Sequence, residues 1–191
     1  MALDRAGNLL GALATVIADR TGEAVSGAAG RSESAAAALS ALLHFLDRPS
    51  VDQLRQVLGL TSSGTVRLLD RLAEAGYIAR LPGTDGRSTA VVLTPAGRQA
   101  AERVTAARAD VLHDALAALT PAEQQTFDQL AGKILVSLIR EPGATRWTCR
   151  LCDTTACGRP RGECPVSTAA QARYGAPPDR PQSSNSSSPP V

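Results

Sequence analysis

Lysine and aromatic residues are scarce in this 191-residue chain. Only 3% of the residues are phenylalanine, tryptophan or tyrosine, which leaves too few rings for the stacking platforms that bind single-stranded nucleic acids. Lys133 is the single lysine among 20 basic residues, so nearly all of the positive charge is arginine. Guanidinium groups suit phosphates and base edges, although heavy use of arginine and alanine also follows from GC-rich coding. Both explanations stay open.

Long apolar runs are missing as well. No stretch approaches the roughly 18 residues of a membrane span. The N-terminus has no basic stretch followed by an apolar core and a small-residue cleavage site. We therefore expect a cytoplasmic protein that makes no membrane contact. The length suits one main domain with appendages.

Histidine is limited to His44 and His113, which lie on separate predicted helices among mostly apolar neighbours. Each is expected to be an ordinary packed or surface residue and not a catalytic base or metal ligand. The sequence also lacks a nucleophile elbow, a phosphate-binding loop and a paired-carboxylate motif. We therefore expect no enzymatic activity.

Capping signals in the middle of the chain indicate two short consecutive helices. Ser50 and Gln53 form the reciprocal capping pair of the first helix, and Gly59 ends it. Thr61 is placed to cap the second helix, which Gly76 terminates in a left-handed conformation. Helix, three-residue turn and helix is the pattern of a helix-turn-helix.

Further elements are predicted on both sides of this pair. Residues 3–25 are predicted to form an amphipathic helix. A glycine-rich break follows, and then a second helix at residues 33–47. The stretch "STAVVLT" indicates the second strand of a hairpin. Threonine–proline pairs then open helices of about residues 95–118 and 120–139. The apolar stripes of the outer helices exceed what one small domain can cover, which predicts a homodimer.

The second helix of a helix-turn-helix lies in the DNA major groove with its N-terminal residues at the base edges. A hairpin directly after it is typical of a winged helix. Arg87 at the hairpin tip would then reach the adjacent minor groove, and Asp85 would brace an arginine and so support the wing. The predicted contacts with double-stranded DNA are Ser62, Ser63, Thr65, Arg67, Arg71 and Arg87.

The stretch "SVDQLRQVLGLTSSGTVRLLDRLAEAGYIARLPGTDGRSTAVVLTPAG" resembles the MarR family of bacterial transcriptional regulators. The likeness rests on "DRL" followed by glycine, on "D-x-R" in the wing and on "LTPAG" at the next helix. Together with the flanking helices it covers roughly residues 3–141. It implies an obligate dimer with interlocked terminal helices that reads a near-palindrome. It also gives Arg67 and Arg87 DNA-contact roles, and Asp70 the role of the acidic residue that holds the wing.

The expected fold is mainly α with a small β-hairpin wing, a winged helix-turn-helix flanked by N- and C-terminal dimerisation helices. Predicted boundaries are 1–32 for the N-terminal dimerisation helix and 33–97 for the DNA-binding domain. The C-terminal dimerisation helices take 98–141. A four-cysteine tail follows at 142–170, and a disordered tail at 171–191 is rich in proline and serine.

Cysteine is absent before the tail, where Cys149, Cys152, Cys157 and Cys164 are separated by two, four and six residues. The two-residue gap lets the first pair grip one metal ion, and nearby glycines let the loop return with the second pair. We expect a structural zinc site. An iron–sulfur cluster, which takes the same ligands, and free thiols that form reversible disulfides are the alternatives. Because the cluster follows the last dimerisation helix, its state would bias that helix and DNA affinity.

These features predict a MarR-type DNA-binding transcriptional regulator, a repressor in the first instance, that binds a near-palindromic operator and is tuned by the cysteine cluster. The alternative is a winged-helix module that docks a protein and binds no specific DNA. In the family, small ligands often bind between the dimerisation helices and the DNA-binding lobe. A small-molecule effector is therefore a further expected partner, although no residue marks its pocket.

Overall fold

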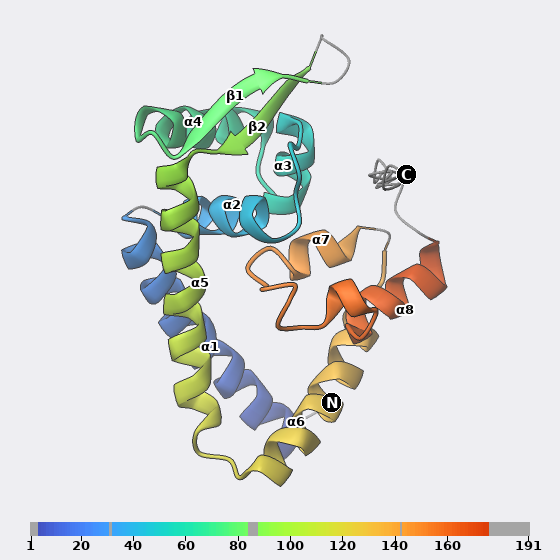
Figure 1. Ribbon diagram of the computed structural model, residues 1–191. Helices are drawn as coiled ribbons and strands as arrows, with labels where there is room; N and C mark the ends of the chain where they lie inside the picture. Colours follow the sequence, from blue (N-terminus) through green and yellow to red (C-terminus); the bar gives the residue numbers. More distant parts are fainter. Residues whose placement is uncertain (1–3, 31, 84–87, 142, 176–191) are drawn as a thin grey trace, which may run out of the picture.

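A computed structural model describes residues 4–30, 32–83, 88–141 and 143–175. This part of the chain is mainly helical with one two-stranded antiparallel hairpin, as the sequence predicts (Figure 1). Helix α1 (Arg5–Ala29) lies along α5 (Pro95–Leu116), and α2 (Glu33–His44) packs on both. Helix α6 (Pro121–Leu138) turns back at the end of α5 and diverges from it (Figure 1).

The predicted helix-turn-helix is formed by α3 (Val51–Leu58) and α4 (Ser62–Glu74). Its caps follow local side-chain chemistry. The Ser50 hydroxyl accepts a hydrogen bond from the Gln53 N–H, and the Gln53 side chain accepts one from the Ser50 N–H. Gly59 ends α3 at a φ of 62°, and the Thr61 hydroxyl accepts the Gly64 N–H at the start of α4.

The wing consists of β1 (Ile78–Pro82) and β2 (Thr89–Leu93), paired so that Ile78 faces Leu93. Thr94 ties the wing to α5 because its hydroxyl donates to the Gly76 carbonyl and accepts the Gly97 N–H. A side chain at position 97 would overlap the backbone of Tyr77, so glycine is required for this close approach.

The main core lies where α2, α4 and the wing meet. Its largest fully buried side chains include Leu39, Leu54, Leu69, Leu72 and Val91. Leu54, Leu69 and Leu72 come from the helix-turn-helix, and Leu39 comes from α2. The core therefore fixes the orientation of α4, whose other face stays exposed.

The structure corrects two N-terminal boundaries. Helix α1 runs through the glycine-rich stretch to Ala29, because Gly27 stays helical and only Gly30 adopts a left-handed φ of 59°. Helix α2 ends at His44, three residues before its predicted end, where Phe45 leaves the helical conformation. In the described residues, no helix is long and apolar enough to cross a membrane.

Residues 143–175 form a small C-terminal lobe beside α6 (Figure 1). It contains α7 (Ala144–Thr148), the 3-10 turn Arg159–Arg161 and α8 (Pro165–Tyr174). Helix α8 extends four residues into the segment expected to be disordered. Its end is anchored because Arg173 Nη1 donates to the Ile139 carbonyl over 2.7 Å.

Candidate nucleic-acid interface and cysteine cluster

The outward face of α4 carries four of the predicted DNA contacts. Ser62, Ser63, Arg67 and Arg71 are all exposed there. The first two lie in the opening turn of the helix, where free N–H groups and the helix dipole favour a negative partner. Hydroxyl and guanidinium donors thus line the side of α4 that turns away from the core.

Thr65 is a correction to the predicted contact set. Its side chain is fully buried, and its hydroxyl donates to the Thr61 carbonyl over 3.0 Å. A side chain in this position faces the core and does not reach a base edge. The burial contradicts a direct DNA contact by Thr65 and assigns it to packing.

Val66 takes an outward position on α4. It is 46% exposed between the serines and Arg67. The signal was present in the sequence, because at about 100° per residue position 66 lies closer to Asp70 than to the buried leucines. An exposed methyl-bearing side chain on such a helix suits contact with a thymine methyl group.

Helix α4 is linked to the wing through Asp70, the residue expected to hold the wing, and no sequence pattern indicates its partner Arg80. Arg80 of β1 donates to the Asp70 carboxylate of α4 over 2.7 Å, and both side chains are partly exposed. Arg48, in the turn after α2, donates to the Pro82 carbonyl at the end of β1 over 3.4 Å. The two predicted wing residues Asp85 and Arg87 lie outside the described residues.

An open hollow of about 630 Å³ lies beside α4 at the start of α2. Arg67 and Arg71 line it together with Ser32, Ser34 and the acidic Asp70. The guanidinium and hydroxyl groups can donate hydrogen bonds to a phosphate oxygen, whereas the Asp70 carboxylate repels an anion.

The C-terminal lobe brings the four predicted metal ligands into one cluster. Cys149 and Cys164 are buried with Ile139 and Val166, and Cys152 and Cys157 pack against them. All four thiols are free. They lie in one cluster, and the Cys157 thiol donates to the Thr154 carbonyl over 3.4 Å. Within the described ranges, no three histidine, cysteine, aspartate or glutamate side chains are already arranged around a common metal position.

The pKa values of Cys149 and Cys152 shift in opposite directions. The interaction between the two neighbouring thiols raises the pKa of Cys149 and lowers that of Cys152. Arg108, Arg159 and Arg150 lower the pKa of Cys152 further, while burial opposes them.

The lobe docks on the helix-turn-helix through α7. The Trp147 ring lies against Gly59, at the turn between α3 and α4, and the Arg150 guanidinium stacks 3.6 Å from the centre of that ring. Arg146 Nη1 donates to the Gln56 side chain of α3 over 3.1 Å. The sequence predicts no role for Trp147, because its partner Gly59 lies far away along the chain.

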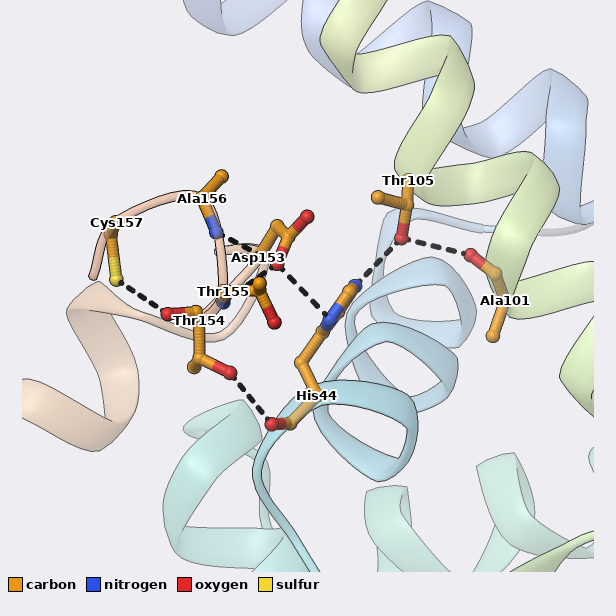
Figure 2. Close-up of polar contacts among 8 residues, drawn as sticks. All are labelled: His44, Ala101, Thr105, Asp153, Thr154, Thr155, Ala156 and Cys157. Atoms are coloured by element: carbon orange, nitrogen blue, oxygen red, sulfur yellow. Dashed lines mark hydrogen bonds and ion pairs between the residues drawn. The ribbon is translucent and has the colours of Figure 1, made fainter. Parts of the chain in front are cut away.

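A second contact joins the cysteine loop to the end of α2, as Figure 2 shows. The Thr154 hydroxyl donates to the His44 carbonyl over 2.8 Å, and Asp153 Oδ1 lies 3.7 Å from His44 Nδ1. Because the Thr105 hydroxyl donates to Ala101, His44 Nε2 must be the donor in its 2.8 Å contact with Thr105. Burial lowers the pKa of His44, so the neutral ring is favoured. His44 is thus a packed, hydrogen-bonded residue.

Residues 29–88 match the sequence profile described as the MarR family. No curated protein sequence matches the chain. Solved structures with similar folds include the transcriptional regulator PA3341, at 28% identity and a TM-score of 0.55, over 69% of this chain and 96% of that one. The Mycobacterium tuberculosis MarR family protein Rv2887, solved with p-aminosalicylic acid, is 26% identical with a TM-score of 0.53, over 67% and 96%.

MepR, a transcription regulator of the Staphylococcus aureus multidrug efflux pump MepA, shares the fold at 18% identity. Its TM-score is 0.61, over 71% of this chain and 99% of that one. These similar chains are matched almost from end to end, whereas about a third of this chain lies outside each match.

Proposed function

We propose that this chain, a MarR-family protein with the fold of MarR-type transcription regulators, binds duplex DNA as a homodimer and controls transcription. The observation that carries the proposal is the exposed face of α4, with Ser62, Ser63, Arg67 and Arg71 directed outward. A helix of this kind fits the major groove, and bidentate arginine contacts discriminate guanine. Repression is the simplest outcome, because a bound dimer blocks access to its site.

Dimerisation is supported by apolar surface that the described chain leaves uncovered. Two helices carry it, α1 and α6, and the exposed side chains are Leu9, Leu10, Leu13, Val16, Phe127, Leu130, Ile134, Leu135 and Leu138. Contiguous patches of large apolar side chains mark interaction surfaces in soluble proteins. A second copy of the chain supplies a matching surface by symmetry and places two recognition helices on one side of the dimer.

Selection from a library of random duplexes tests the DNA-binding proposal, and we expect it to enrich a near-palindromic sequence. Arg67→Ala should weaken binding to that duplex by about 1–3 kcal/mol and relax base preference at one position of each half-site. The matched control is Arg103→Ala, which removes an exposed arginine from α5, away from the α4 face.

Salt dependence separates DNA binding from the rival proposal of a protein-docking module. A dimer that contacts phosphates should lose affinity steeply as salt rises, because bound counterions are released. Failure to enrich any sequence, together with weak binding that Arg67→Ala leaves unchanged, would favour the docking module.

A further inference from the structure

The C-terminal lobe contains very little apolar material besides its cysteines. Its buried apolar side chains are Cys149, Cys164 and Val166, and Ile139 joins them from the end of α6. A unit of this size does not bury enough apolar surface to stay folded alone, and below about 40 residues a metal or disulfides usually supply the missing stability. We therefore ask whether the four thiols supply the stability that the small apolar core of the lobe lacks.

Positively charged side chains lie near the cysteine cluster. The guanidinium groups of Arg108, Arg159 and Arg150 all interact electrostatically with Cys152, and the Arg159 backbone N–H donates to the Thr154 carbonyl that also accepts the Cys157 thiol. Arg108 belongs to α5, so this positive environment includes the main domain as well as the lobe. Positive charge beside the cluster can offset part of the negative charge that four thiolates bring to a metal centre.

We propose that the four cysteines bind a thiophilic metal centre, either one zinc ion or one iron–sulfur cluster, and that this centre makes the C-terminal lobe a brace between α6 and α3. Both centres are held by four cysteine thiolates. The four thiols already share one small core. To hold the centre they close on a common position and lose their protons to solvent.

The contacts of the lobe explain why a metal there acts as a brace. On one side, Pro165 of α8 lies against Gly132 of α6, and Arg173 holds the last carbonyl of that helix. On the other side, Trp147 covers Gly59 at the end of α3. Trp147 lies two residues before Cys149, and Pro165 directly follows Cys164. Loss of the metal should therefore release both contacts together.

Metal analysis of the full-length protein, purified without oxygen, tests the centre without using DNA. We expect about one zinc per chain, or iron with acid-labile sulfide and visible absorbance, and at most about a tenth of that content in Cys152→Ser and Cys164→Ser. The matched control is Thr155→Ser, in the same loop and exposed, which should keep the metal. Zinc and iron content distinguish the two centres.

A second measurement does not depend on variants, which can lose metal simply because they misfold. Wild-type protein is stripped of metal with a chelator and titrated with Co²⁺. The expected result is the absorption of tetrahedral cobalt–thiolate coordination at about one ion per chain. Two disulfides in place of any metal, a metal content that the serine variants leave unchanged, or no cobalt–thiolate signal would each overturn the proposal.

Amide hydrogen exchange tests whether the metal-bound lobe stabilises the end of α3. Removing the metal should speed amide exchange in residues 143–175 and at the end of α3 near Gly59, while the centre of α5 stays protected. Unchanged exchange at the end of α3 would show that the lobe binds a metal without bracing the helix-turn-helix. This result concerns folding alone and stands whether or not the protein binds an operator.

Discussion

The hydroxyl of Thr65 already has a partner inside the protein, the carbonyl of Thr61. Thr65→Val keeps the shape of the side chain and removes this buried hydrogen bond. We expect the free energy of unfolding to fall by about 0.5–1.5 kcal/mol, measured by urea denaturation, while DNA affinity measured by fluorescence anisotropy stays unchanged.

Ser63→Ala is the matched control for Thr65→Val, because Ser63 is a hydroxyl residue on the exposed side of the same helix. It should weaken DNA binding and leave stability nearly unchanged. A tenfold loss of affinity in Thr65→Val without loss of stability would restore Thr65 to the DNA contact set.

Residue-level prediction succeeded where a side chain acts on its own neighbours. The capping pair of Ser50 and Gln53 joins residues three apart, and such patterns are legible without tertiary structure. Asp70 illustrates the limit. Its ion-pair partner Arg80 lies beyond the turn after α4, so the pairing depends on how β1 folds back.

At the scale of elements, the docking of α7 on α3 depends on the absence of a side chain at Gly59. A Cβ there would lie 2.8 Å from the Trp147 ring, and φ is also positive at this residue. Gly59→Ala should therefore cost about 1–2 kcal/mol of strain, plus a steric penalty from Trp147. Urea denaturation measures the sum.

Two comparisons isolate the steric part of the Gly59→Ala cost. Gly30→Ala has a similar positive φ and open space at the Cβ position, so it measures strain alone. In a Trp147→Ala background, Gly59→Ala should cost no more than this control, a non-additivity of about 0.5–3 kcal/mol. Equal costs in both backgrounds would mean that α7 does not rest on the turn after α3.

The sequence predicted the helix-turn-helix and wing but not the position of the C-terminal lobe, for a physical reason. Caps and periodic apolar residues specify elements locally. The contact between Arg146 and Gln56 joins residues 90 apart, and neither residue carries a signal for the other. The cysteine spacing indicated a cluster, whereas the surfaces on which the lobe docks became evident only from the fold.

At the scale of the whole molecule, the two ends of the described chain differ in how they are packed. The end that holds α3, α4 and the wing is packed around buried leucines, whereas α6 turns back and diverges from α5 at the opposite end (Figure 1). Leu130, Ile134 and Leu138 recur on one face of α6, and each is at least 43% exposed. A face with this spacing is built to pack on another helix. In the proposed dimer, the same surface of a second copy covers this face.

Ile134→Asp should convert the proposed dimer into a monomer. A carboxylate buried in an apolar helix interface has no partner, and its desolvation weakens association by about 2–5 kcal/mol. This corresponds to a rise in the dimer dissociation constant of roughly 30-fold to several thousand-fold. Gln125→Glu, on the opposite side of α6, adds the same charge outside the stripe and should leave the dimer intact. Light scattering across a range of protein concentrations distinguishes the two variants. If Ile134→Asp has the same mass as the wild type at micromolar concentration, α6 does not form the interface, and the spacing of the recognition helices must be set by another surface.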